Sequence, residues 1–350
     1  MNTPSHVKRF DKRCIAIHTG VSSYLDHLGP LSILLNIPMI VSDPLVYQDA
    51  RRYYPDLNLT CMNPSDLSLP FLAENFDVIL SSGHYWAVEL IPLLKLFCQK
   101  DMRVIYCPHG NSDKGWSRSK PLIKDLTFIY GPQMLARLDD VKDYIVTGNY
   151  RFPYYLERKD FYDKLLAEEL AGRLSPLKKT LLYAPTWNDP ENPTTFFTDC
   201  ENLLKDLSSY NVIVKLHPFL FDDHPIEVEK IKQNFPDAVF LLNFPPIYPI
   251  LNYCDAYVGD FSSIGYDFLS FDKPLFFLTE SKGILSQTGL VLPSHDKGSF
   301  IEKNWQADLK HKRQEIYQYA FGESRDMQEV RLEMERALMH ESPTKEKITS

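Results

Sequence analysis

The sequence predicts an α/β protein with two doubly wound parallel sheets, that is, two Rossmann-like domains that face a cleft. Two observations carry this prediction. Short apolar runs alternate with segments of helical periodicity along the chain, and this alternation breaks near residues 167–179 and then restarts. The length of 350 residues also exceeds what one hydrophobic core normally serves, so two domains are expected.

In the first half, apolar runs predict strands, and the stretches between them have apolar residues three and four positions apart, as in an amphipathic helix. The predicted strands are residues 14–18, 38–42, 77–81, 103–107, 127–130 and 144–147, and the predicted helices include 22–36 and 86–99. Strands that are apolar on both faces indicate a parallel sheet covered by helices on both sides.

The second half repeats this pattern. The predicted strands are residues 180–183, 212–216, 238–242, 256–258 and 274–278, and the predicted helices are 195–207, 225–234 and 262–271. From residue 315 onward the chain is helical and charged, and it ends in a polar tail that we expect to fray. The predicted domains are therefore residues 1–172 and 173–325, followed by a C-terminal helix and tail at 326–350.

Composition narrows the classes of function. A net charge of −8 argues against a protein that wraps nucleic acid and against strong adsorption to anionic membranes. The six cysteines form no C-x-x-C pair, there is no apolar leader, and no run of 18 apolar residues occurs. These features predict a cytoplasmic protein with at most peripheral contact with the inner face of the membrane.

Common cofactor signatures are also missing from the sequence. Neither the G-x-G-x-x-G fingerprint nor the P-loop pattern occurs, so a standard nicotinamide or NTP-hydrolysing site is not expected. The acidic pairs Asp139-Asp140 and Asp222-Asp223 have no second converging set of ligands, so no metal is expected. We predict no cofactor.

A histidine follows a strong apolar strand in the second half. His217 comes after the run 212–216 and before Pro218, which ends the strand and places the imidazole at the rim of the sheet. Lys215 adds positive charge nearby. A lone histidine beside a strand is often a structural hydrogen-bonding group, but this position suits donation to a phosphate oxygen or protonation of a leaving group.

Two serines follow another predicted strand of the second half, residues 256–258. Asp260 precedes Phe261 and the pair Ser262 and Ser263, which open a helix. One serine would be explained as an ordinary N-cap, whereas two after a buried strand indicate a cradle for a phosphate or diphosphate. Asp267, further along the same helix, could order the loop, contact a ribose, or serve only as a solvated or capping residue.

The first domain has its own histidine after a strand. His109 precedes Gly110, which permits close backbone approach, and a polar loop follows. His109 is the best candidate for a general base in this domain; the alternative is a turn histidine that satisfies backbone groups. His84 is a weaker candidate of the same kind. Thr186, Trp187 and Asn188 end the first strand of the second domain and could contact a ligand, or simply pack.

These segments together resemble the CDP-glycerol glycerophosphotransferase family, the teichoic-acid primases and polymerases, which have a GT-B architecture. The matching segments span roughly residues 100–280 and are His109-Gly110, 182–187, 214–218, Asp260-Phe261-Ser262-Ser263, 267–268 and 272–274. One departure stands out: family members tend to have Thr-Pro-Leu-Lys after His-Gly, whereas this chain has Asn111-Ser112-Asp113-Lys114.

The resemblance implies an enzyme whose first domain binds the acceptor and whose second binds a CDP-linked donor. His109 would be the base, His217 would contact phosphate, Ser262 and Ser263 would hold the diphosphate, and the Thr186 loop would face the same cleft. Glycerol phosphate, or a related polyol phosphate, would pass to an acceptor hydroxyl during cell-surface polymer synthesis, and CMP would leave. The acceptor would be lipid-linked or polymeric.

Two other functions remain open at this point. A GT-B glycosyltransferase would use a nucleotide sugar and attack carbon instead of phosphorus. A non-catalytic nucleotide-binding protein on the same fold would bind the donor without turning it over, and the altered loop after His109 gives this alternative some weight.

Overall fold

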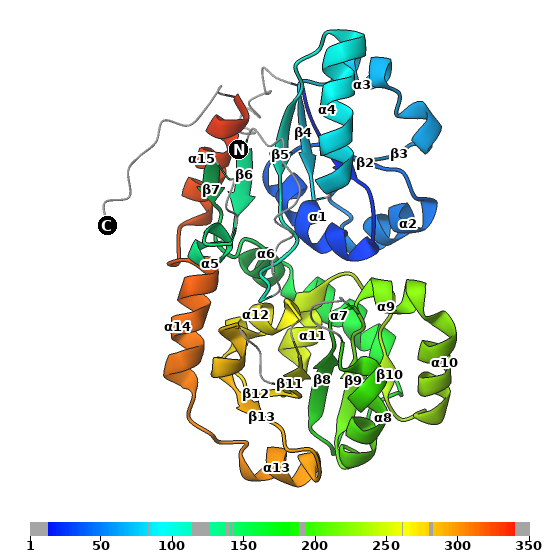
Figure 1. The fold of residues 1–350 in the computed structure, drawn as a ribbon, viewed down its shortest axis with the longest axis vertical. Helices are drawn as coiled ribbons and strands as arrows, with labels where there is room; N and C mark the ends of the chain where they lie inside the picture. The colour runs from blue at the N-terminus through cyan, green and yellow to red at the C-terminus, as the bar shows by residue number, and fades with distance from the viewer. Residues whose placement is uncertain are drawn as a thin grey trace, which may run out of the picture.

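The computed structural model describes residues 13–82, 84–113, 126–137, 141, 143–188, 194–260, 262–279 and 283–339. It contains two all-parallel sheets, one above the other along the long axis of the molecule (Figure 1). Helices lie on both sides of each sheet, so the predicted α/β fold class is confirmed.

The first sheet has seven strands in the order β3-β2-β1-β4-β5-β6-β7. Its strands are β1 (Cys14–His18), β2 (Met39–Val41), β3 (Leu59–Cys61), β4 (Val78–Ser81), β5 (Arg103–Tyr106), β6 (Leu126–Ile129) and β7 (Tyr144–Val146). Six of the seven match the predicted runs to within two residues. The edge strand β3 was not predicted, because it is short and partly exposed and so has no apolar run.

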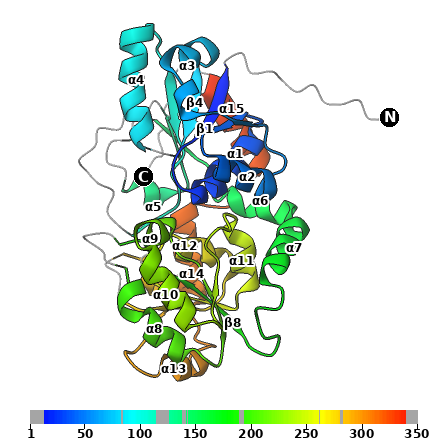
Figure 2. The ribbon, with the colours of Figure 1, turned by 90° about the vertical axis from the view of Figure 1, so that its right-hand side faces the viewer.

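The two faces of this sheet are covered by different helices. The helical elements are η1 (Ser22–Tyr24), α1 (Leu25–Leu34), α2 (Pro44–Tyr53), η2 (Pro64–Asp66), α3 (Leu69–Asn75), α4 (His84–Cys98), α5 (Pro132–Leu135), α6 (Arg151–Glu157) and α7 (Lys159–Leu170). Cys14 and Ala16 of β1 pack in one core cluster with the leucines of α1, whereas Ile15 and Ile17 pack in another with α3 and α4. Figure 2 shows α1 on one side of the sheet and α3 and α4 on the other.

The second sheet has six strands in the order β10-β9-β8-β11-β12-β13. Its strands are β8 (Thr180–Ala184), β9 (Asn211–Val214), β10 (Val239–Phe240), β11 (Ala256–Gly259), β12 (Leu275–Phe277) and β13 (Leu290–Val291), and its helical elements are α8 (Phe196–Asp206), α9 (Pro218–Asp223), α10 (Pro225–Asn234), α11 (Ile247–Tyr253), α12 (Ile264–Phe268), η3 (Leu269–Phe271), η4 (Leu285–Thr288) and α13 (Lys297–Lys303). The two-residue edge strand β13 was not predicted.

The C-terminal helices connect the two halves of the molecule. Helix α14 (Lys310–Phe321) lies beside the second sheet and ends at Gly322, whose φ of +78° suits glycine. Helix α15 (Met327–Met339) then packs beside β7 of the first sheet, where Arg325 donates to the carbonyl of Val146 at 2.9 Å. The expectation of helix from residue 315 was thus five residues late. The predicted domain boundaries stay a prediction.

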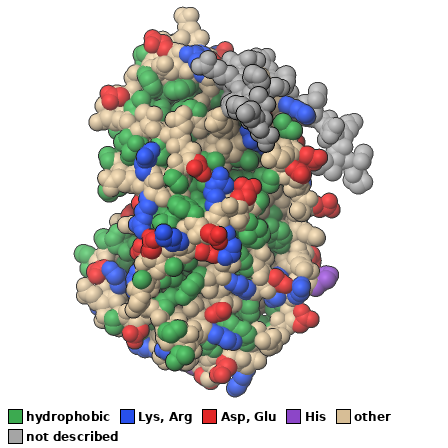
Figure 3. All heavy atoms as spheres, turned by 180° about the vertical axis from the view of Figure 1, so that it is seen from behind, with side chains coloured by type: hydrophobic (Ala, Val, Ile, Leu, Met, Phe, Trp, Pro, Cys, Tyr) green, Lys and Arg blue, Asp and Glu red, His purple; other side chains and the backbone are tan. Residues whose placement is uncertain are grey.

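The surface seen in Figure 3 carries interspersed Lys/Arg and Asp/Glu side chains, many of them at mid-height. Within the described ranges, every helix is too short or too polar to span a bilayer.

Candidate active site

The turn after β5 touches the turn after β11, so the exits of the two sheets meet. Gly110 has φ of +117°, and a Cβ placed on it would lie 3.2 Å from Cβ and 3.3 Å from Oγ of Ser263. A side chain at residue 110 would therefore strain the backbone and press on this serine. The structure brings His109, Gly110, Ser262 and Ser263 into one region, although they are about 150 residues apart in the sequence.

His109 lies in a buried, mostly aromatic environment. Its ring centroid is 4.4 Å from that of Tyr24, and burial lowers the pKa of His109 to about 4, although a hydrogen bond with the backbone of Ser82 acts in the opposite direction. Among the described residues, no group bonds to its buried Nδ1. The imidazole is therefore neutral near pH 7 and keeps a lone pair, which a general base needs.

His217 caps the short helix α9. Its Nδ1 accepts a hydrogen bond from the backbone N–H of Phe219 at 3.3 Å, and Pro218 occupies the first helical position. Because Nδ1 is the acceptor, the neutral ring carries its proton on Nε2. That tautomer is the one that can donate to a phosphate oxygen. The ring of Trp187 lies 6.4 Å away, centroid to centroid.

Lys215 is buried, with its ammonium turned toward backbone carbonyls. Nζ donates to the carbonyls of Leu241 at 3.3 Å and Leu242 at 3.4 Å. Burial lowers the pKa of Lys215 to about 8, and the carboxylates of Asp26 and Asp49 oppose this shift. The contacts shown are structural; a direct bond from Lys215 to a ligand stays a prediction.

Asp260 joins two loops at the end of the second sheet. Its Oδ1 accepts from the backbone N–H of Thr186 at 2.8 Å, and its Oδ2 accepts from the N–H and the hydroxyl of Thr195 at 3.1 and 3.0 Å. The carboxylate therefore positions the Thr186 loop, and Thr186 itself is buried. This role could not be read from the sequence, because Asp260 and Thr186 come from neighbouring strands 74 residues apart.

Ser262 behaves partly as the simpler interpretation predicted. Its Oγ accepts from the backbone N–H of Ile264 at 3.4 Å, at the start of α12, which is only five residues long. Ser263 faces Gly110. Beside this loop, Trp187 is half-buried and Asn188 is exposed. The assignment of these residues to a ligand stays a prediction.

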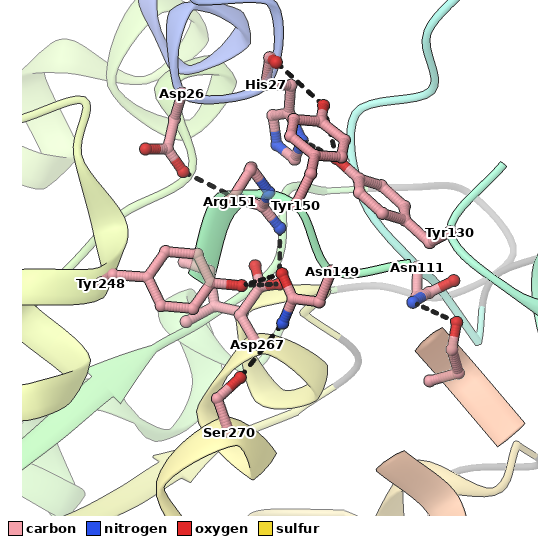
Figure 4. Close-up of polar contacts among 12 residues, drawn as sticks. Asp26, His27, Asn111, Tyr130, Asn149, Tyr150, Arg151, Tyr248, Asp267 and Ser270 are labelled. Carbon is pink, nitrogen blue, oxygen red and sulfur yellow. Dashed lines mark hydrogen bonds and ion pairs between the residues drawn. The ribbon is translucent and has the colours of Figure 1, made fainter. Parts of the chain in front are cut away.

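A buried ion cluster crosses between the two halves (Figure 4). Arg151, at the start of α6, donates to Oδ2 of Asp26 at 2.8 Å and to Oδ1 of Asp267 at 2.5 Å. The hydroxyl of Tyr248 donates to Oδ1 of Asn149 at 2.7 Å and lies 3.2 Å from Oδ1 of Asp267. Asp267 thus has a structural partner, and its predicted contact with a ligand is untested. Asp26 carried no local sequence signal.

The remaining candidates divide by position. Asp222 and Asp223 end α9. The side chain of His84 and the pair Asp139-Asp140 lie outside the described residues.

The loop that departs from the family pattern is anchored to the second half. The carboxylate of Asp113 is about 1% exposed and accepts from the hydroxyl of Tyr266 at 2.5 Å and from the N–H of Leu285 at 3.1 Å. Gly283 makes room for it, since a Cβ there would lie 1.9 Å from Cγ of Asp113. Asn111 donates to the carbonyl of Ala320 at 3.1 Å. These bonds hold the chain just after His109.

We expect Asp113→Ala to lower the free energy of unfolding by about 2–3 kcal/mol, because a buried, charge-assisted set of hydrogen bonds is lost. Urea denaturation measures this change. Tyr266→Phe should have a smaller effect, and the double variant should lose less than the sum, since both act on one bond. Asp237→Ala, at an exposed aspartate, is the matched control. Equal losses of unfolding free energy in Asp113→Ala and Asp237→Ala would show that the hydrogen bonds of Asp113 do not stabilise the fold.

Two parallel sheets whose strand exits meet at a histidine and a serine pair define a GT-B-like α/β protein. Within this class, residues 152–291 match the model of the family described as CDP-Glycerol:Poly(glycerophosphate) glycerophosphotransferase, which confirms the resemblance predicted from the motifs.

Two curated relatives belong to teichoic acid synthesis. One is a teichoic acid ribitol-phosphate polymerase, TarL, of Staphylococcus aureus, 33% identical over 124 residues, which are 33% of this chain and 21% of that protein. The other is a teichoic acid glycerol-phosphate primase of Bacillus spizizenii, 28% identical over 162 residues, which are 43% of this chain and 40% of the primase. The matched segments thus span about a fifth and two fifths of these relatives.

Solved structures confirm the fold. The wall teichoic acid polymerase TagF superposes with a TM-score of 0.62 at 14% identity, covering 93% of this chain and 89% of that one. A UDP-GlcNAc 2-epimerase from Neisseria meningitidis, bound to UDP-GlcNAc, superposes with a TM-score of 0.56 at 12% identity, covering 93% and 100%. Because these neighbours differ in activity, the fold alone does not identify the reaction.

Proposed function

We propose that this protein transfers glycerol phosphate, or a related polyol phosphate, from a CDP-linked donor to an acceptor hydroxyl in cell-surface polymer synthesis, and releases CMP. The family match over 152–291 supports the reaction class. The observation that carries the proposal is the close approach of Gly110 to Ser263, because it brings the loop of His109 next to the loop of the serine pair.

In this proposal the second half of the molecule binds the donor and the first half binds the acceptor. The diphosphate of the donor lies against Ser262 and Ser263, and Nε2 of His217 donates to one of its oxygens. The acceptor oxygen attacks the distal phosphorus, its proton passes to His109, and the bond to CMP breaks in line. Phosphoryl transfer of this type depends mainly on positioning and charge stabilisation.

The location follows from the acceptor. We place the reaction in the cytoplasm, at the inner face of the membrane, where a lipid-linked or polymeric acceptor is met. The protein's contact with that surface is peripheral in this proposal.

Calorimetric titration with CDP-glycerol, CDP, UDP-sugars and NAD tests the donor. We expect selective binding of the cytidine compounds, weakened at least tenfold in His217→Ala because one charge-assisted hydrogen bond to phosphate is lost. His295→Ala, at an exposed histidine, should bind as the wild type does. Cytidine binding that His217→Ala leaves unchanged would contradict the donor site.

A nucleotide-sugar glycosyltransferase is the second candidate, favoured by the structural similarity to a protein bound to UDP-GlcNAc. Release of UDP from UDP-sugars, with no CMP from CDP-glycerol, would replace our proposal with it. Donor binding without turnover would support the non-catalytic alternative.

A further inference from the structure

Three buried polar atoms at the C-terminal ends of central strands of the first sheet have no hydrogen-bond partner among the described residues. They are Nε2 of His18, Oγ of Ser82 and Nδ1 of His109. His18 and Ser82 are each only 2% exposed. A buried polar atom without a partner destabilises the folded state, so three such atoms close together indicate a site that a ligand can complete.

The three atoms come from adjacent strands. In the parallel pair β1–β4, Ala16 lies level with Leu80, so His18 falls level with Ser82 two residues further on. In β4–β5, Ser81 lies level with Tyr106, and His109 follows three residues later. Neighbouring strands are about 4.8 Å apart. Because β4 lies between β1 and β5, the three groups span about two strand spacings, or about 10 Å.

Alternation along the strands puts His18 and Ser82 on one face. Ala16 and Leu80, two positions earlier, both pack in the core cluster of α1, and side chains two residues apart share a face. Tyr24, just before α1, links this face to the base: its ring lies 6.4 Å from that of His18 and 4.4 Å from that of His109.

Both imidazoles are neutral and offer lone pairs. Burial lowers the pKa of His18 and of His109 to about 4. The imidazole of His18 also has hydrogen bonds with the backbone of His18 and of Val21, and the imidazole of His109 has one with the backbone of Ser82. Each of these bonds raises the pKa of its histidine, as expected when a ring N–H donates to a carbonyl. The other ring nitrogen of each histidine is therefore an acceptor. Two such nitrogens and one hydroxyl suit a ligand that brings O–H donors, not an anion.

We propose that His18 and Ser82, together with His109, bind the acceptor through two neighbouring hydroxyls of a polyol or a sugar. His18 and Ser82 hold the hydroxyl that does not react, and the reacting hydroxyl points at Nδ1 of His109. Its oxygen forms the new bond to phosphorus, its proton goes to Nδ1, and the electron pair of the broken P–O bond leaves with CMP. This inference rests on the proposed function for the identity of the reaction, but the hydroxyl site can be tested without it.

Initial rates of CMP release from CDP-glycerol, with glycerol or ribitol as the acceptor, test the site in the complete reaction. We expect His18→Ala and Ser82→Ala each to raise the acceptor KM about tenfold, with a smaller effect on kcat, since each removes one hydrogen bond. His18→Gln should restore part of the loss, because its amide oxygen can accept in place of Nε2. His311→Ala, at an exposed histidine, is the matched control. An unchanged acceptor KM in Ser82→Ala would overturn the proposal even if His18→Ala failed to fold.

Direct binding separates this inference from the proposed function. In protein labelled with ¹⁵N-histidine, glycerol or ribitol should shift the signals of the unprotonated ring nitrogens of His18 and His109 without any donor present. Inorganic phosphate should leave these signals in place. A shift with phosphate but not with polyols, or no shift with either, would overturn the site. A polyol shift in a protein that neither binds CDP-glycerol nor releases CMP would retain the site and reject the reaction.

Discussion

Replacement of His109 by alanine is expected to reduce turnover by about 10²–10⁴-fold, which corresponds to about 3–5 kcal/mol of lost barrier lowering. The reason is that general-base assistance disappears while the fold remains, since His109 lies in a loop after β5. CMP release at saturating donor measures the loss, and circular dichroism checks the fold. His295→Ala serves as the control. Full turnover in His109→Ala would show that another group takes the proton.

The pH profile distinguishes His109 from an exposed histidine. Because burial lowers its pKa to about 4, the free enzyme keeps His109 unprotonated at pH 5, and kcat/KM should not show an acid limb at the ordinary value of about 6.5. The base is lost only as the pH falls through about 4. An acid limb near 6.5 that disappears in His109→Ala would contradict the burial of this group in the working enzyme.

Removal of Arg151 is expected to lower the free energy of unfolding by about 3–5 kcal/mol. Arg151→Met leaves the carboxylates of Asp26 and Asp267 buried without their cation, and breaking a buried pair costs this much. Urea denaturation measures the loss. Arg331→Ala removes an i,i+4 pair with Glu335 on an exposed face and should cost no more than about 0.5 kcal/mol. Similar losses in the two variants would argue against the importance of the buried cluster.

The pH dependence of the Arg151 variant adds a second test. Burial already raises the pKa of Asp26, and Arg151 opposes that shift. Without Arg151, the folded-state pKa rises further above the unfolded value, so the folded protein binds more protons. Stability is then retained at low pH and lost as the pH rises. The deficit of Arg151→Met relative to wild type should accordingly be smaller at pH 5 than at pH 8.

The fold was largely predictable because its signals are local. Central strands are apolar on both faces, so runs such as those of β4 and β11 stand out in the sequence, and their predicted ends differ from the observed ones by at most one residue. The edge strands β3 and β13 were missed because they are short and partly exposed. The return of α15 to the first sheet had no local signal either.

The sequence by itself determined that this chain forms two parallel sheets and that His109, His217 and the Ser262-Ser263 pair follow strands, because periodicity and strand-ending residues are written locally. Only the tertiary structure decided which groups these side chains meet. Asp260 holds the Thr186 loop, Asp267 pairs with Arg151, and the rings of His18 and His109 both lie near that of Tyr24. Hydrogen bonds and the desolvation that shifts a pKa act over a few ångströms, and the fold alone brings residues 74 or 116 positions apart within that range.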